Sequence, residues 1–399
     1  MASELIPIIK AYAKSLIPSI VNIRRDLHQH PELSFMEKRT SELIKSFLAK
    51  HGIQFTEGWA GYGIVATIRG NADGPLVMLR ADMDALPIQE ENDVPYRSVE
   101  DGIMHACGHD VHTSSLLGAA VILNEHKAHI HGEIRLIFQP GEEKLPGGAS
   151  MMIDEGLFNV GKPDWIIAQH VHPPLQAGHV GFRSGLYMAS ADEIYITIKG
   201  KGGHAATPHL CIDPIVIAAR VVTALQEMIS RTKDPMSPGV LTIGRIWSDG
   251  GATNVIPDSV HMEGTLRAMD ERWRSDTHQR IKTLIEHLCI ASGATNETKI
   301  VIGYPSLIND DKVTSMCREA AVQYLGEDKV HELPLRMTSE DFAFYTQLAP
   351  ASFYRLGTGW EDAGRNFPVH SNRFDINEDA LETGMGLLAY IALSDLSHH

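Results

Sequence analysis

The chain has 399 residues and a mass of 43.9 kDa, which is enough for two or three domains with sizeable hydrophobic cores. Hydrophobic residues make up 43% and charged residues 21%, a balance that is typical of globular proteins and excludes a disordered or fibrous chain. With 35 Lys and Arg against 50 Asp and Glu, the formal net charge of −15 would repel nucleic acids and anionic membrane surfaces. We therefore expect neither a nucleic-acid partner nor a membrane partner.

The cysteines and the N-terminal segment indicate a cytoplasmic protein. The four cysteines lie far apart, without the dense spacing of a secreted disulfide framework: Cys107, Cys211, Cys289 and Cys317. Glu4 and Lys10 interrupt the first apolar stretch, so it lacks the continuous hydrophobic region of a signal peptide. No apolar run approaches the ~18 residues that a membrane span needs.

The first part of the chain predicts an α/β layered domain. Helical spacing of apolar residues predicts two amphipathic helices over about 5–27, separated at Pro18. A third helix is expected from about Glu37 to Lys50, ending at Gly52. Short apolar segments then predict strands at 63–69, 76–81, 132–139 and 164–171, with a helix near 111–124. Strands that alternate with helices are typical of this class of domain.

The pattern changes near residue 187 and returns after Tyr304. A strand in EIYITIKGKGG, a helix opened by Asp213 and Pro214, strands in LTIGRIW and VHMEGTLRAM, and a helix over about 270–291 predict an α+β segment. A helix, a strand at 352–357 and a last helix capped by Asn377 then resume the first pattern. We therefore predict that residues 1–186 and 302–399 form one domain with a shared sheet, interrupted by an inserted domain at 187–301.

Polar clusters directly follow three of the predicted strands, and a fourth lies where the helix near 111 begins. They are Asp82 and Asp84 after LVMLRA, Glu142 and Glu143 after EIRLIFQPG, His170 and His172 after WIIAQ, and Cys107 and His109 in ACGHD. In open α/β sheets, ligands bind beyond the carboxyl ends of the strands. Each cluster alone is more typical of a solvated turn, a buried thiol or a core histidine. Together, a thiolate, imidazoles and carboxylates are the ligand set of zinc or a similar divalent ion, and two ions can share such a site.

The motifs resemble those of a known family, in order and spacing, over nearly the whole chain. They are RRDLHQHPELSF, RADMDALPIQE, MHACGHDVHT, IFQPGEE, KGKGGHAATP, TNVIPD, EGTLRAMD, TSEDFAFY and HSNRFDINEDAL. The chain is similar to the metal-dependent aminoacylase and hippurate hydrolase family of the co-catalytic zinc exopeptidase group. This family includes auxin-conjugate hydrolases and N-acetyl-diaminopimelate deacetylases. The resemblance implies a three-layer α/β/α catalytic domain with an inserted α+β, ferredoxin-like dimerisation domain.

The resemblance also implies a two-metal centre. Its ligands would be Cys107, His109, Glu143, His170 and His370, with the Cys107 thiolate shared between the ions. Zn²⁺ is the expected metal, with Mn²⁺, Co²⁺ or Ni²⁺ as alternatives. Glu142 would act as the general base and acid, and Asp84 would orient a ligand histidine. In the exopeptidase branches the position of Asp82 is normally a ligand histidine, so this departure favours the amidohydrolase branch.

For the inserted domain, the resemblance implies a homodimer in which His204 reaches the partner's active site and stabilises an oxyanion. Asn254 and Arg267 would bind the substrate, and the forked donors of the Arg267 guanidinium suit an α-carboxylate. Two alternatives remain open. His204 lies in a Gly-rich turn where it could be structural, and Arg267 could pair with a nearby acid.

The expected function is therefore hydrolysis of the amide bond of N-acyl-L-amino acids by a metal-activated water, with Glu142 as general base. A dipeptidase or carboxypeptidase of the same fold and an N-acetyl-diaminopimelate deacetylase are the alternatives within enzymes. A metal-binding or conjugate-binding protein without turnover is the alternative outside them. The chain has no G-x-S-x-G motif, which argues against a serine hydrolase.

Overall fold

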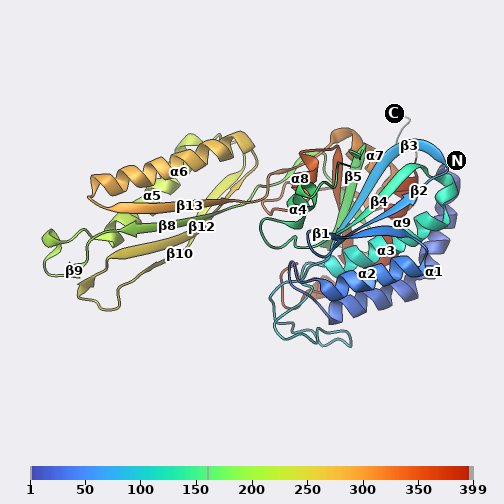
Figure 1. The fold of residues 1–399 in the computed structure, drawn as a ribbon, viewed down its shortest axis with the longest axis horizontal. Helices are drawn as coiled ribbons and strands as arrows, with labels where there is room; N and C mark the ends of the chain where they lie inside the picture. The colour runs from blue at the N-terminus through green and yellow to red at the C-terminus, as the bar shows by residue number, and fades with distance from the viewer. Residues whose placement is uncertain (1, 160, 395–399) are drawn as a thin grey trace. The chain divides into compact units, whose positions relative to one another are not determined.

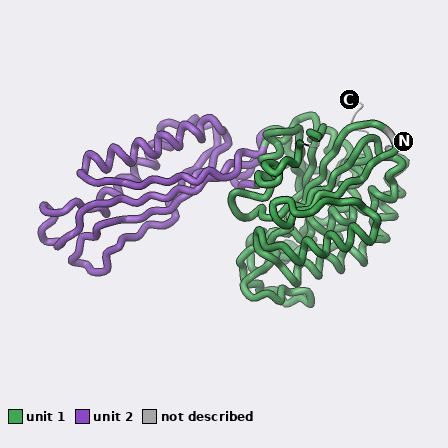
Figure 2. The backbone as a smooth tube through the Cα atoms, viewed as in Figure 1, with its two compact units in different colours: residues 1–185, 308–334, 341–399 green, residues 186–307, 335–340 purple. Residues whose placement is uncertain are grey.

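The computed structural model describes residues 2–159 and 161–394, which form two compact units (Figure 2). Unit 1 contains residues 1–185, 308–334 and 341–399, and unit 2 contains residues 186–307 and 335–340. Residues 302–307 and 335–340 thus belong to unit 2, whereas the sequence placed them in the outer domain. Backbone hydrogen bonds explain this difference, because the N–H of Ala189 donates to the carbonyl oxygens of Arg336 and Thr338, and that of Ala191 donates to Tyr304.

Unit 1 contains an eight-stranded sheet in the order β1-β2-β4-β3-β5-β16-β6-β15. The strands are β1 (Gln54–Trp59), β2 (Gly63–Arg69), β3 (Ala72–Asp82), β4 (His131–Gln139), β5 (Trp165–Gln176), β6 (Val180–Phe182), β15 (Val330–Glu332) and β16 (Ala351–Gly359). β3 pairs in parallel with both β4 and β5, and β16 pairs in parallel with β5. The outer parts of the chain therefore share one sheet, as predicted, and the carboxyl ends of β3, β4 and β5 meet at one edge.

Helices cover both faces of this sheet. They are α1 (Ala2–Gln29), α2 (Lys38–Lys50), α3 (His109–Glu125), α4 (Gly148–Asp154), α7 (Asp311–Leu325), α8 (Ala343–Thr346) and α9 (Ala380–Leu393). Figure 1 shows α1, α2 and α3 on one side of the sheet and α4 and α8 on the other. Neighbouring residues of β16 alternate between the two faces: the Phe353 ring lies 5.3 Å from Phe342, beside α8, while Tyr354 joins the core beneath α3 and α9. The predicted three-layer α/β/α architecture is confirmed.

Two predicted helix boundaries in unit 1 are wrong. A single helix, α1, replaces the two predicted ones, with Pro7 and Pro18 inside it. Ile9, Ile20 and Leu27 along α1 are fully buried, and this burial outweighs the local cost of proline in the helix. The last helix begins after Asp379 rather than at Asn377, because residues 377–381 form tight turns, with hydrogen bonds from the Ala380 N–H to Asn377 and from the Leu381 N–H to Glu378.

Unit 2 has the ferredoxin-like order of elements β8-α5-β10-β12-α6-β13 (Figure 1). Its four-stranded antiparallel sheet runs in the order β10-β12-β8-β13. The elements are β8 (Asp192–Lys199), α5 (Pro214–Thr232), β10 (Gly239–Ser248), β12 (Ser259–Ala268), α6 (Glu271–Ala291) and β13 (Thr295–Ile302). Ile194, Ile196 and Ile198 alternate along β8 and pack in one core with residues of α5 and α6. The predicted α+β fold of the inserted domain is confirmed.

Short strands complete the two units. β9 (Gly203–His204) pairs with β11 (Val255–Ile256) in unit 2. β7 (Gly185–Met188) and β14 (Leu307–Asn309) contain two of the points at which the chain passes from one unit to the other, and it passes again on either side of residues 335–340. Within residues 2–159 and 161–394, no helix combines the length and the apolar composition that crossing a membrane requires.

Candidate metal centre

The start of α3 lies against β5 at the edge where the parallel strands end. Gly108 precedes α3 with φ of 81°, and a Cβ atom at this position would lie only 2.6 Å from the Val171 side chain. Glycine is therefore required for this close approach. As a result, Cys107 and His109, which flank Gly108, lie beside His170 of β5, and the Cys107 Sγ is 3.5 Å from the His170 Nε2.

All five residues predicted as metal ligands are brought together in unit 1. Ligand atoms of Cys107, His109 and His170 lie within 4.8 Å of one another, as do those of Cys107, Glu143 and His370. Cys107 is common to both groups, which is the position required of a shared ligand. The His370 Nε2 is 3.2 Å from the Glu143 Oε1. His370 has a φ of 65°, a left-handed conformation supported by a hydrogen bond from its N–H to the Ala106 carbonyl at 2.7 Å.

His109 is oriented by Asp84. The His109 Nδ1 is 3.1 Å from the Asp84 Oδ1, and both side chains are buried. The Nε2 of His109 is also buried and has no hydrogen-bond partner among the described residues. A histidine whose Nδ1–H donates to a carboxylate, with its Nε2 lone pair left over, is typical of metal ligation. The residues present therefore fit a metal site.

The electrostatics of the pocket favour a divalent cation. Burial raises the pKa of the Cys107 thiol well above its usual range, and the Glu143 and Glu142 carboxylates raise it further. Burial lowers the pKa of His109, but the Asp82 and Asp84 carboxylates outweigh burial and raise it to about 10. Without a metal, the Cys107 thiol and the His109 ring therefore both retain their protons. Thiolate, imidazole and carboxylate ligands together suit zinc and similar ions, which would replace those protons.

Asp82 and His112 connect β3 to β5 by hydrogen bonds next to the predicted ligands. Asp82 accepts a hydrogen bond from the Arg80 Nη1 at 2.6 Å, and its other oxygen is 2.5 Å from the His112 Nδ1. The His112 Nε2 in turn accepts the Val171 N–H at 2.9 Å, so both ring nitrogens of His112 are used. Asp82 and His112 are thus fixed by their contact with each other and by their hydrogen bonds with Arg80 and the Val171 backbone. The sequence assigned no clear role to His112, whose link to Val171 joins segments that are distant in the chain.

Glu142 lies next to the ligand cluster on the loop after β4. A carboxylate oxygen of Glu142 and ligand atoms of His109 and Glu143 lie within 4.8 Å of one another, and the Glu142 side chain is largely buried. The Glu142 N–H donates to the Asp84 Oδ1 at 3.1 Å, and its Oε1 accepts the Asp341 N–H at 3.3 Å. The structure therefore places a carboxylate that could exchange protons directly beside the predicted ligands.

The three predicted residues of unit 2 occupy two places within it. His204 and Asn254 are neighbours, because β9 pairs with β11 and the Ala205 N–H donates to the Asn254 carbonyl at 2.9 Å. The His204 Nδ1 accepts the Ala206 N–H at 3.0 Å, so the ring proton is on Nε2, at the exposed tip. Arg267 lies in β12, is half-buried, and donates to the Ser339 hydroxyl at 2.6 Å.

Three further residues contact this region and had no role in the sequence analysis. The Ser34 hydroxyl donates to Asp84 at 2.6 Å, Glu37 accepts the Gly141 N–H at 2.8 Å, and Asp341 donates its N–H to Glu142. Ser34 and Asp341 lie within the motifs PELSF and TSEDF, and Glu37 lies two residues after the first of them. The motifs marked these segments, but only the tertiary contacts show what the side chains do.

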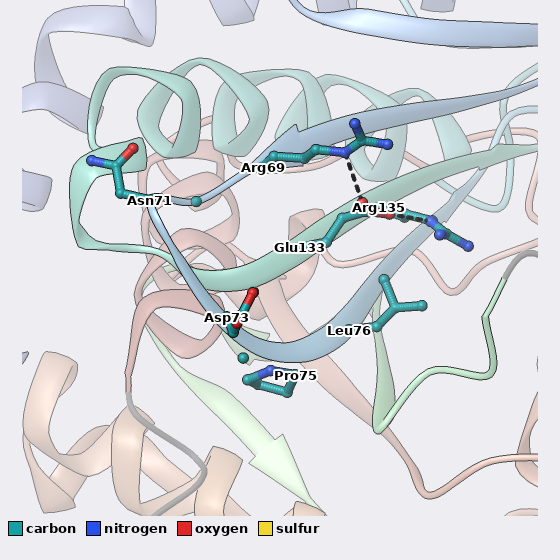
Figure 3. Close-up of a pocket in the computed structure, with 10 residues that line it drawn as sticks. Arg69, Asn71, Asp73, Pro75, Leu76, Glu133 and Arg135 are labelled. Carbon is teal, nitrogen blue, oxygen red and sulfur yellow. Dashed lines mark hydrogen bonds and ion pairs between the residues drawn. The ribbon is translucent and has the colours of Figure 1, made fainter.

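A separate surface pocket of unit 1 lies at the start of β3, whereas the candidate metal centre lies at the end of this strand (Figure 3). Glu133 lies between Arg69 and Arg135, which donate to its two oxygens at 3.0 and 2.6 Å. Asp73, at the start of β3, also lines this pocket, whereas Asp82 ends the strand at the metal centre. None of the predicted site residues lines this pocket, so the chemistry is concentrated at the other edge of the sheet.

Comparisons with known proteins agree with this chemistry. The chain is 40% identical over 368 residues to N-acetyl-L-cysteine deacetylase of Bacillus subtilis, covering 92% of this chain and 86% of that protein. It is 39% identical over 395 residues to thermostable carboxypeptidase 2 of Saccharolobus solfataricus, covering 98% of each. Its fold matches the crystal structure of the YXEP protein of Bacillus subtilis, a dinuclear metal binding peptidase, with a TM-score of 0.83 and 35% identity over 97% of this chain and 99% of that one.

The sequence profile of the peptidase family M20/M25/M40 matches residues 78–394. This match covers most of the chain, including the loops that carry Cys107, Glu142 and His370. The resemblance to the amidohydrolases of this group is thereby confirmed, and the chain is a metal-dependent amidohydrolase. It belongs to the peptidase family M20/M25/M40.

Proposed function

We propose that this enzyme hydrolyses the amide bond of N-acyl-L-amino acids. The observation that carries the proposal is the placement of Glu142 beside a buried cluster of thiol, imidazole and carboxylate groups. The position that is a ligand histidine in the exopeptidase branches holds Asp82, which is bonded to Arg80 and His112 instead. The relative with 40% identity is by name a deacetylase of an N-acyl amino acid.

The proposed centre holds two divalent ions on Cys107, His109, Glu143, His170 and His370. Zn²⁺ is the first candidate, and Mn²⁺, Co²⁺ and Ni²⁺ are alternatives. Such ions, when bound, acidify water and polarise a carbonyl group. The Glu142 carboxylate would accept a proton from the attacking water and transfer it to the nitrogen of the leaving amine. The Asp341 N–H holds Glu142 in place, and Asp84 fixes the ring of His109.

In unit 2, we propose that His204 donates its Nε2–H to the oxyanion in the active site of the partner subunit of a homodimer. The hydrogen bond from the Ala206 N–H to the His204 Nδ1 supports this role, because it leaves Nε2 as the donor. Asn254, beside His204, and Arg267 would bind the substrate. The Arg267 guanidinium donates one hydrogen bond to the neutral Ser339 hydroxyl, and its forked donors suit the two oxygens of an α-carboxylate. The four free cysteines support a cytoplasmic location.

The variant Glu142→Gln tests this function. The amide cannot accept the proton, so we expect kcat to fall by roughly 10²–10⁴-fold while both metal ions stay bound. Free amino acid released from N-acetyl, N-benzoyl, long-chain N-acyl and N-acetyl-diaminopimelate substrates measures activity, and elemental analysis measures metal content. Glu155→Gln is the matched control, because that carboxylate accepts the Ala60 N–H outside the centre. Near-normal turnover by the metal-loaded Glu142→Gln variant would refute the assignment.

A second candidate function is that of a carboxypeptidase. The 39% identity to thermostable carboxypeptidase 2 favours it. A comparison of N-blocked amino acids with peptides that have a free amino terminus separates the two functions. Faster release of the C-terminal residue from free peptides than from every N-acyl amino acid would favour the carboxypeptidase.

A further inference from the structure

Glu37, the residue before α2, is a buried carboxylate to which no role has been given so far. Its side chain is fully buried, and its Oε1 accepts the N–H groups of Phe35 at 2.9 Å and Gly141 at 2.8 Å. Its Oε2 is buried without a hydrogen-bond partner among the described residues. Burial, together with the neighbouring Asp84 carboxylate, raises the pKa of Glu37 to about 7. A buried acid without a cationic partner destabilises a fold, which points to another reason for its presence.

The second observation concerns the backbone of the loop that carries Glu142. Three consecutive N–H groups of this loop donate to two buried carboxylates: Gly141 to Glu37, Glu142 to one oxygen of Asp84, and Glu143 to the other. Asp84 therefore fixes the second and third residues, and Glu37 fixes the first. Without the Glu37 carboxylate, the N–H of Gly141, the first of these three groups, would lose this side-chain acceptor.

The segment before α2 also fits the loop sterically. Gly141 has a φ of 62°, and a Cβ atom there would lie 2.3 Å from the Phe35 ring. Phe35 itself has a φ of 65°, and its N–H is bound by the same Glu37 oxygen. The Ser34 hydroxyl donates to Asp84 at 2.6 Å, so residues 34–37 include one of the two acids that hold the loop and contact the other.

From these contacts we propose that Glu37 is a positioning residue, which fixes the backbone of Gly141 and thereby, together with Asp84, the place of the Glu142 carboxylate. The proposal rests on the proposed role of Glu142 as general base. A displacement of about 1 Å of a reacting group can reduce the rate about 10²-fold, so a loop held at only two of its three points is expected to lose turnover.

Glu32 provides a matched control within the same segment. Its carboxylate also accepts two backbone N–H groups, from Arg39 at 2.9 Å and Thr40 at 2.8 Å. These donors lie at the start of α2 and not in the loop of Glu142. Glu32→Ala and Glu37→Ala therefore remove the same chemical group and the same number of backbone hydrogen bonds, but only Glu37→Ala releases Gly141.

The experiment uses the full chain loaded with Zn²⁺ and N-acetyl-L-cysteine and N-benzoylglycine as substrates. We expect Glu37→Ala to lower kcat about 10²-fold with KM little changed and two metal ions bound. Glu32→Ala should keep the wild-type kcat, although both variants lower the unfolding temperature. Glu37→Gln should restore most of kcat, because its amide oxygen can accept both N–H groups.

The proposal is overturned if metal-loaded Glu37→Ala keeps the wild-type kcat, if Glu32→Ala loses as much kcat, or if Glu37→Gln is as impaired as Glu37→Ala. Glu142→Gln separates this failure from that of the proposed function. If Glu142→Gln is active, the role of the general base fails; if it is inactive while Glu37→Ala is fully active, only the positioning role fails.

Ser34→Ala keeps the test decisive if Glu37→Ala does not fold. It removes the hydroxyl that joins the segment to Asp84, and Ser184→Ala is its control, because the Ser184 hydroxyl donates to Asp311 at the same distance of 2.6 Å. A loss of kcat confined to Ser34→Ala supports the proposal. Equal kcat values in the two serine variants overturn it.

Discussion

Replacing Asp84 by asparagine should destabilise both the fold around the metal centre and the binding of metal. The Asp84 carboxylate accepts four hydrogen bonds, from His109 at 3.1 Å, Ser34 at 2.6 Å, Glu142 at 3.1 Å and Glu143 at 2.9 Å. Asparagine has a single acceptor oxygen. Whichever way the amide lies, its NH₂ group faces two of these four donors. The Ser34 hydroxyl or the His109 Nδ1 can accept from the amide instead, but the backbone N–H of Glu143 or Glu142 beside it loses its acceptor.

A buried donor left without a partner costs about 1–3 kcal/mol, so the free energy of unfolding of metal-free Asp84→Asn should fall by about that amount. The ring of His109 also loses its fixed orientation in one of the two amide positions, and metal affinity should fall by about 10–100-fold. Urea unfolding monitored by fluorescence measures the first effect. Competition with a chelator of known affinity measures the second.

Asp310→Asn is the control for Asp84→Asn. Asp310 caps α7 by accepting the Val313 N–H at 2.9 Å, and asparagine caps helices about as well. Its free energy of unfolding should therefore stay within about 0.5 kcal/mol of the wild type. If Asp84→Asn matched Asp310→Asn in both unfolding and metal affinity, the reasoning from the four hydrogen bonds would be refuted.

Three further outcomes are expected. Cys107→Ser weakens the ligand that both candidate groups share, so elemental analysis should find fewer than two bound ions; two ions would contradict a shared thiolate. Gly141→Ala places a Cβ atom 2.3 Å from the Phe35 ring, so kcat should fall and be partly recovered by adding Phe35→Ala; no recovery would rule out the steric cause. Burial raises the pKa of Asp192, but hydrogen bonds led by Arg274 lower it to about 2. The charged form therefore contributes up to about 2 kcal/mol above pH 4, and this contribution is lost as the pH falls from 4 through 2. The unfolding free-energy difference between wild type and Asp192→Asn should shrink over that range, and a constant difference would contradict the ion pair.

Several features of unit 1 could be predicted from the sequence because they depend on local patterns. Short apolar runs bounded by Gly, Pro or Asp identified β2, β3, β4 and β5 to within a few residues, except where β3 and β5 extend further. The carboxyl ends of parallel strands meet at one edge, so the polar residues after these strands could be placed together. Motif resemblance then supplied the roles of Cys107, Glu142 and their neighbours.

Local patterns failed where long-range contacts decide the outcome. Pro18 predicted a helix break, yet α1 continues through it because the burial of Ile9 and Ile20 in the core outweighs the backbone cost. Asn377 was predicted to cap the last helix, and its N–H donates to Thr358 of the adjacent strand, but tight turns separate it from the start of α9 at Ala380.

The sequence by itself determined the order of the elements, the ferredoxin-like insertion and the residue types at the strand ends. Only the tertiary structure decided which carboxylate accepts a hydrogen bond from which donor. Asp84 and His109 are separated by 25 residues, and Glu37 and Gly141 by 104. A hydrogen bond depends on distances of about 3 Å and on direction, which sequence spacing does not encode once the chain has folded back on itself. For that reason the composition of the metal centre could be read from the motifs, whereas the side chains that hold its ligands and its candidate base could not.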